Sequence, residues 1–353
     1  MSVKYFLGAN SPTGFYSLYD DFVNLKDGDF LWIIKGGPGC GKSSFMRKIG
    51  RAAEDAGMDV EYIYCSGDPS SIDGIYIPEA KIAYADGTPP HVMELTNAGV
   101  SSLYVDMGGF YNRVALKGWL QELMDATKRY KEHYVRAYAI LGAAGGIAPS
   151  RLPELFGDEE AAVVFKRAKG VIARELARND SETLRTKQRF ISAVTCEGEI
   201  FCGDTVEKLC DRVYTLDNDF GMAPMYLNLI HRAAQERGIA AVLCPDPMFP
   251  ENLEAVLLPE LSLGFLAIDS RRGYDGSVYR HVRLDAITEN KAKIARQRYR
   301  TALKQYNELL RSATGELAEA KRLYARIEGI YNPHVDFDGI YELAEQHIKN
   351  LIG

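Results

Sequence analysis

A glycine-rich loop near residue 40 constrains the fold of this chain more than any other segment. It consists of Gly36, Gly37, Pro38, Gly39, Cys40, Gly41, Lys42, Ser43 and Ser44. An apolar stretch of strand length, residues 30–35, leads directly into the loop, and apolar residues recur at helical spacing after it, from Phe45 to Ala53. A strand, a glycine loop and a helix in this order predict a βα unit whose loop N–H groups and helix N-terminus face an anion.

The loop matches the pattern GxxxxGK[ST], in which glycines reach unusual φ and ψ angles and let phosphates approach the backbone. We expect Lys42 to contact the β- and γ-phosphates of a nucleoside triphosphate and the Ser43 hydroxyl to ligate its magnesium ion. Ser44 is expected to contact the α-phosphate, and Cys40 to contribute its backbone more than its side chain. The nucleotide is expected to be ATP rather than GTP, since no NKxD motif for reading guanine follows the loop.

A further magnesium ligand is expected at the carboxyl end of another strand in the same sheet. Asp86 ends the apolar stretch that begins at Lys81, and it is the leading candidate for a metal ligand and catalytic residue. Asp106, after residues 103–105, is a weaker candidate. The alternative for Asp86 is that its side chain only caps a turn.

The group that would activate the attacking nucleophile is less clear in the sequence. No glutamate follows Asp86 directly, so the usual water-activating base is not visible. His91 and Glu94 are possible substitutes, although a histidine in a proline-rich loop is more often a surface residue. Asp68 and Asp73 follow the second predicted strand, residues 60–65, and are expected either to face the γ-phosphate or an acceptor, or to be turn residues.

The second half of the chain repeats the first in the same order. Phe6, Ala9 and Gly14 fall on Phe190, Ala193 and Gly198, Gly57 falls on Gly238, and Asp86 falls on Asp269 after a slip of two residues. Matches that keep their order along the chain indicate duplication of one α/β unit.

The second copy has lost the glycine loop. Residues 214–224 take its place, without the glycine cluster, the lysine or the serine hydroxyl of the first copy. Asp217 and Asp219 would repel a triphosphate, and Pro224 cannot donate a backbone N–H. We therefore expect one nucleotide site per chain, with the second half as its structural partner.

Helical sequence follows each α/β copy. Apolar and aromatic residues from Leu116 to Leu141 form a stripe that the glycine-rich run 142–146 ends. Residues 286–327 form a second helical pattern, which is expected to break near Thr314 and Gly315 into an antiparallel hairpin. The expected fold is α/β, with mostly parallel sheets flanked by helices, an internal duplication and helical hairpin insertions. Its two domains are expected at residues 1–180 and 181–353.

Basic residues gather in two places of the second half. Arg271 and Arg272, beside Asp269, are expected to form an exposed solvated pair, with an arginine finger that reaches the nucleotide as the alternative. The second helical pattern carries Lys291, Lys293, Arg296, Arg298, Arg300 and Lys304. We expect these to form a solvated helix face, and the alternative is a contact with nucleic acid or an acidic partner.

Composition narrows the class of protein further. Among 353 residues, 46% are hydrophobic and 25% are charged, which is typical of a globular chain of about two domains. The net charge of −6 argues against nucleic acid as an obligatory partner. Six cysteines without a CxxC pair indicate neither zinc nor a disulfide framework. The chain has no apolar run of about 18 residues and no signal-peptide pattern, so we expect a cytoplasmic protein without a membrane segment.

These motifs resemble those of a family of bacterial tandem P-loop proteins, within the P-loop NTPase superfamily, that are described as ATPases or nucleotide-kinase-like. The segments that carry the resemblance are Lys35–Ser43, Tyr64–Pro69 and Asp86–His91, and the resemblance extends over nearly the whole chain. Family members can keep a glycine loop in both halves, and this chain departs from that pattern in its second half.

Three functions remain open from the sequence. The leading hypothesis is a magnesium-dependent ATP hydrolase whose nucleotide state changes the packing between the halves or moves the helices. The second is a small-molecule or nucleotide kinase, in which Asp68, Asp73 or His91 would orient an acceptor hydroxyl. The third is a nucleotide-binding switch without catalysis, which the missing glutamate and the decayed second loop would fit.

Overall fold

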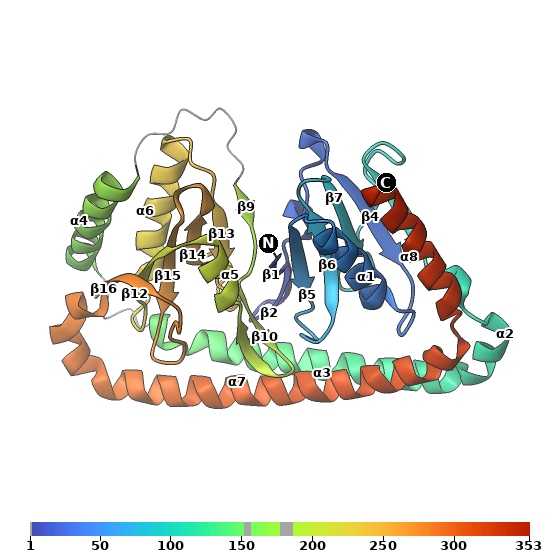
Figure 1. Cartoon of the computed structure of the whole chain (residues 1–353). Helices are drawn as coiled ribbons and strands as arrows, with labels where there is room; N and C mark the ends of the chain where they lie inside the picture. Colours follow the sequence, from blue (N-terminus) through green and yellow to red (C-terminus); the bar gives the residue numbers. More distant parts are fainter. Residues whose placement is uncertain (1, 152–156, 177–185) are drawn as a thin grey trace.

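The computed structural model describes residues 2–151, 157–176 and 186–353, which form two α/β halves that lie side by side on a pair of long helices (Figure 1). The strands of the first sheet are β1 (Ser2–Phe6), β4 (Phe30–Lys35), β5 (Val60–Tyr64), β6 (Ile72–Ile77), β7 (Ile82–Asp86) and β8 (Ser102–Asp106). Their order across the sheet is β1-β5-β6-β7-β4-β8. Strand β6 runs antiparallel to both neighbours, whereas the other three pairings are parallel.

The second sheet has the same plan. Its strands are β9 (Lys187–Gln188), β12 (Arg212–Asp217), β13 (Val242–Pro245), β14 (Leu253–Leu258), β15 (Leu263–Ile268) and β16 (Val278–Val282). Their order, β16-β12-β15-β14-β13-β9, is that of the first sheet when each strand is replaced by its counterpart. Strand β14 is antiparallel to both neighbours, as β6 is. The α/β class and the two similar halves are therefore confirmed, with sheets that are mixed.

The two halves meet through equivalent residues. Each has a small hairpin, β2 (Gly8–Ser11) with β3 (Gly14–Ser17) in the first and β10 (Ser192–Thr195) with β11 (Gly198–Phe201) in the second. Just before these hairpins, Phe6 and Phe190 exchange two backbone hydrogen bonds of 2.8 and 2.9 Å. Because these two residues occupy the same position in the repeat, the halves face each other in a nearly symmetric way.

Helices cover the sheets of both halves. They are α1 (Lys42–Asp55), α2 (Arg113–Leu116), α3 (Leu120–Gly146), α4 (Asp158–Glu175), α5 (Gly203–Leu209), α6 (Ala223–Glu236), α7 (Glu289–Tyr331) and α8 (Phe337–Ile352). The buried face of α1, which includes Phe45 and Ile49, shares one core with the strands of the first sheet and with α8. Helices α6 and α4 cover the second sheet in the same way. No helix in the described ranges is both long and apolar enough to cross a membrane.

The predicted helical hairpin is wrong, because α7 is one uninterrupted helix of 43 residues. It packs along α3, and the two run the length of the molecule beneath both halves (Figure 1). Near the expected break, Ala313 and Leu317 are buried against this layer. A single glycine costs a helix only about 1 kcal/mol relative to alanine, so burial of its neighbours keeps the helix continuous through Gly315.

The long helices cross between the halves. Helix α7 leaves the second half, and α8, which follows it, packs against α1 of the first half. Conversely, α3 leaves the first half, and α4, which follows it in the chain, packs against α6 of the second. The predicted boundary between residues 180 and 181 lies outside the described residues.

The basic residues at the start of α7 are mostly solvent-facing. Lys291 pairs with Glu160 of α4 at 2.7 Å. Arg296, Arg300 and Lys304 are exposed, and the side chain of Lys293 lies outside the described ones.

Candidate functional site

The glycine loop connects the end of β4 to the start of α1, as its sequence predicts. Gly39 and Gly41 have φ angles of 69° and 76°, in the left-handed region that favours glycine. The ammonium group of Lys42 donates to the carbonyl oxygens of Gly36 and Gly37, both at 3.0 Å. The loop therefore curls around its own lysine, and an incoming phosphate would have to compete with these two carbonyls for the ammonium group.

Asp86 lies beside this lysine. Strand β7 is the parallel neighbour of β4, and in the register Asp86 is opposite Ile34, so the carboxyl end of one strand meets the loop that leaves the other. The Asp86 carboxylate is 3.6 Å from the Lys42 ammonium group and accepts hydrogen bonds from the Thr88 N–H and hydroxyl at 2.9 and 2.6 Å. Burial raises the pKa of the Asp86 carboxyl group, and the charge of Lys42 opposes that shift.

The hydroxyl and thiol groups of the loop have different environments. The Ser43 hydroxyl oxygen accepts from the Ile72 N–H at 3.1 Å, while Ser44 is exposed. The Cys40 thiol is buried and donates to the Gly37 carbonyl at 3.1 Å. Burial raises the pKa of this thiol, so Cys40 is a structural side chain of the loop rather than a reactive one.

The loop opens onto a cavity of about 400 Å³. The first half contributes loop residues 39–44, Asp86 and His91, together with the residues that follow β5. Helices α3 and α7 contribute the opposite side, with Tyr130, Tyr134, Lys321, Tyr324, Ala325 and Glu328. No sequence motif marks the residues of α7 as part of the site. They reach it only because this helix crosses from the second half to the first.

The end of α7 also holds the loop in place. The side-chain amide of Asn332, in the orientation that satisfies both partners, donates to the carbonyl oxygens of Gly39 at 2.7 Å and Glu328 at 3.2 Å. From the other side, the Tyr111 hydroxyl donates to the Pro38 carbonyl at 3.0 Å. A Cβ atom at Gly39 would lie 2.4 Å from the Asn332 side chain, so only glycine fits there without a shift of α7.

His91 is buried, which corrects the expectation of a surface histidine. Its Nε2 lies 3.1 Å from the Asp73 carboxylate, and both side chains are less than a tenth exposed. The imidazole packs against the rings of Phe15 and Tyr19, with centroid separations of 5.3 and 4.7 Å. Burial opposes the charged form, but the Asp73 carboxylate outweighs it and raises the pKa of His91 above its ordinary value.

The other acidic candidates differ in their access to the cavity. Asp68 lines it and forms an ion pair with Lys321 at 2.7 Å. Burial opposes ionisation of Asp68, but hydrogen bonds from Lys321 and Ser70 lower its pKa below the ordinary value. Asp106 is exposed and accepts from the Gly108 N–H at 2.7 Å, and Glu94 is exposed and accepts from the Tyr104 hydroxyl at 2.6 Å. Neither of these two lines the cavity.

The corresponding region of the second half is occupied by its own ion pairs. Asp217 pairs with His281 at 2.9 Å, and the Asp219 carboxylate accepts from the Ser270 N–H at 2.8 Å. Helix α6 begins at Ala223, followed by Pro224, where α1 begins with Lys42 and Ser43.

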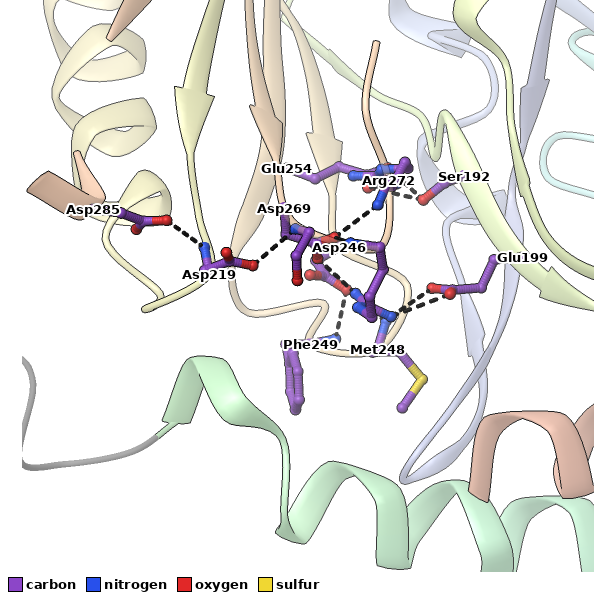
Figure 2. Close-up of polar contacts among 12 residues, drawn as sticks. Ser192, Glu199, Asp219, Asp246, Met248, Phe249, Glu254, Asp269, Arg272 and Asp285 are labelled. Carbon is purple, nitrogen blue, oxygen red and sulfur yellow. Dashed lines mark hydrogen bonds and ion pairs between the residues drawn. The ribbon is translucent and has the colours of Figure 1, made fainter. Parts of the chain in front are cut away.

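The two arginines of the second half are bonded to carboxylates of their own half. Arg271 bonds to Glu199 at 3.1 Å and to Asp269 at 2.8 Å. Arg272 pairs with Glu254 at 2.7 Å, close to the Ser192 hydroxyl (Figure 2). Arg271 is exposed, as expected, and Arg272 is only partly exposed. Neither lines the first-half cavity, so the alternative of an arginine finger is not what this structure shows.

The structure thus brings together loop residues 39–44, Asp86, Asp68, Asp73 and His91 around one cavity, and leaves Asp106 and Glu94 outside it. No family model, curated protein or solved structure with which the chain was compared matches it. Function is therefore argued from the geometry of this cavity.

Proposed function

We propose that the first half binds ATP with magnesium and hydrolyses it, as a member of the P-loop NTPases. The observation that carries this proposal is the position of Lys42, at the start of α1, between the loop carbonyls and Asp86 at the edge of a 400 Å³ cavity. A loop with left-handed glycines, a lysine and a helix N-terminus directs positive charge and N–H groups at one place, which suits a triphosphate.

The same edge of the cavity offers ligands for magnesium. The Ser43 hydroxyl and the Asp86 carboxylate are hard oxygen donors of the kind that Mg²⁺ prefers, and both line the cavity. Bound there, the ion would supply positive charge to the phosphate oxygens. The role of Lys42 would be to leave the Gly36 and Gly37 carbonyls and contact the β- and γ-phosphates.

The test is isothermal titration of the whole chain with MgATP and with a non-hydrolysable analogue, alongside assays of ADP release. We expect Lys42→Ala to abolish binding and turnover without unfolding the chain, since the polar contacts of this side chain with the described residues are those with the loop and Asp86. Lys131→Ala, which removes an exposed lysine of α3, is the matched control and should behave like wild type. Unchanged binding in Lys42→Ala would show that the loop is not the nucleotide site.

A kinase is the second candidate, favoured by one observation. The cavity extends beyond the loop to a wall of aromatic side chains from α3 and α7, namely Tyr130, Tyr134 and Tyr324. The rings of Tyr130 and Tyr324 are 5.5 Å apart, so the two helices form a continuous surface there. A triphosphate tail does not need such a wall, whereas an organic acceptor would. ADP release that depends on an added hydroxyl compound would favour this function over hydrolysis.

A further inference from the structure

We propose that His91 is the catalytic proton acceptor for the nucleophile that attacks the γ-phosphate, and that Asp73 is its positioning residue. This inference rests on the proposed function. It identifies a catalytic base in a chain in which no glutamate follows Asp86 directly. The nucleophile is an O–H group, either water or the hydroxyl of an acceptor.

The two nitrogens of the His91 ring differ in their bonding, because one contacts Asp73 and the other has no partner among the described residues. His91 lines the cavity that Lys42 and Asp86 also line. Its Nε2 is 3.1 Å from Asp73, which fixes the proton on that nitrogen, because a carboxylate can only accept. The remaining nitrogen, Nδ1, is buried and has no hydrogen-bond partner among the described residues. A buried polar atom without a partner is costly in a folded protein, and a substrate O–H group that reached Nδ1 would complete its hydrogen bond.

His91 and Asp73 are held in place by the residues packed around them. The rings of Phe15 and Tyr19 pack against the imidazole, and Asp73 is a buried residue of β6, next to the strand that ends in Asp86. A general base must keep its lone pair in one direction, and a ring that is packed and bonded in this way cannot rotate freely.

The second half serves as an internal comparison. Strands β6 and β14 align so that Asp73 corresponds to Glu254, and each carboxylate pairs with a side chain from the segment that follows the neighbouring strand, His91 after β7 and Arg272 after β15. The second half keeps a buried ion pair there, Glu254 with Arg272 at 2.7 Å (Figure 2). An arginine stays protonated and cannot accept a proton. The copy that lost the phosphate-binding loop thus also lacks the proton acceptor.

Transfer of the γ-phosphoryl group needs no reagent other than ATP and the nucleophile. The nucleophile oxygen forms a bond to the γ-phosphorus while the bond from that phosphorus to the β–γ bridging oxygen breaks. The proton of the nucleophile moves to Nδ1 of His91, and ADP leaves with the electron pair of the broken bond. Asp73 stabilises the imidazolium that forms, and it remains ionised.

The experiment compares binding with turnover in His91→Gln. We expect kcat for ADP formation to fall about 100-fold or more, the usual contribution of a general base, while the Kd for the non-hydrolysable analogue changes less than about twofold. His231→Gln, which changes a histidine of α6 outside the cavity, is the matched control. Two arms, ATP alone and ATP with glycerol, ribose, adenosine or cytidine, distinguish water from an acceptor hydroxyl through the phosphorylated product.

The pH profile separates catalysis from a purely structural role. The groups that act on His91 are Asp73 from β6, Asp86 from β7 and Lys42 from α1, and Tyr19 lies against its ring. Wild-type kcat should rise with pH as His91 loses its proton, through a midpoint above the ordinary histidine value. Asp73→Asn removes the charge that favours the protonated form, so its midpoint should move to lower pH.

Four results have fixed meanings. Turnover of His91→Gln at the wild-type rate overturns the inference, as does an unchanged pH midpoint in Asp73→Asn. If His91→Gln does not fold, the pH dependence of kcat in Asp73→Asn tests the inference by itself. If wild type binds no MgATP, the proposed function itself fails, and the titration shows this before any kinetic assay.

Discussion

The carboxylate of Asp86 has two neighbours that a metal ion would rearrange, Lys42 at 3.6 Å and Thr88 at 2.6 Å. If Asp86 ligates magnesium directly or through water, Asp86→Asn should weaken binding of MgATP by about 10- to 100-fold, the value of one lost charge-assisted contact. Binding of ATP in the presence of EDTA should change far less, because the loop and Lys42 remain. Titrations with and without magnesium measure both quantities, and an equal loss in both would assign Asp86 a structural role.

At the residue scale, the sequence predicted the glycine loop and Asp86 as neighbours in one site, but not the buried pair of His91 and Asp73. Gly36–Ser44 and Asp86 could be identified from the sequence because a loop pattern and a strand end are local features. The burial of His91 could not be predicted, because it depends on the antiparallel strand β6, which places Asp73 beside β7. Two residues 18 positions apart (91 minus 73) form an ion pair through sheet order alone, and strand order is not a local property of sequence.

Helix α7 carries the prediction at the scale of elements. Gly315 lies inside this helix, and a Cβ atom there would meet nothing within 4 Å. Gly315→Ala should therefore raise the free energy of unfolding by about 0.5–1 kcal/mol, because alanine loses less backbone entropy in a helix. Chemical denaturation measures this value. Gly273→Ala, at an open position outside the helices and strands, is the control and should change stability little.

A destabilising Gly315→Ala would mean that the chain bends at this position, as the hairpin prediction requires. That prediction failed because it gave weight to local helix propensity. Propensity differs by about 1 kcal/mol per residue, whereas burial of a leucine such as Leu317 contributes about 1.5–3 kcal/mol. The strands, by contrast, were predicted well at β4, β5 and β7, where apolar runs end at glycine, cysteine or aspartate.

At the scale of the whole molecule, the sequence revealed the duplication but not the exchange of helices between its two halves. Matching positions such as Gly57 and Gly238 recur in order, so the repeat was visible without a structure. Which half a helix packs against depends on its length and direction, and α7, at about 65 Å, is long enough to reach the other half. Its residues Lys321 and Glu328 thereby enter the first-half cavity.

The last prediction is that one chain binds one triphosphate, although it contains two similar halves. Both halves have a left-handed glycine before this helix, Gly41 in the first and Gly221 in the second. The first half then offers Lys42 and Ser43, whereas the second starts its equivalent helix with Ala223 and Pro224. Without a lysine and with a proline, the second site lacks a cation and an N–H donor.

Carboxylates make a second site less favourable still. Asp217 and Asp219 stand at the equivalent strand end, and Arg271, which follows the neighbouring strand β15, is already bonded to Glu199 and Asp269. Titration of wild type with a magnesium complex of a non-hydrolysable ATP analogue should therefore give a stoichiometry near one, and Lys42→Ala should give no binding. Two sites in wild type, with one retained in Lys42→Ala, would show that these carboxylates do not exclude the nucleotide and that the second half binds it by another arrangement.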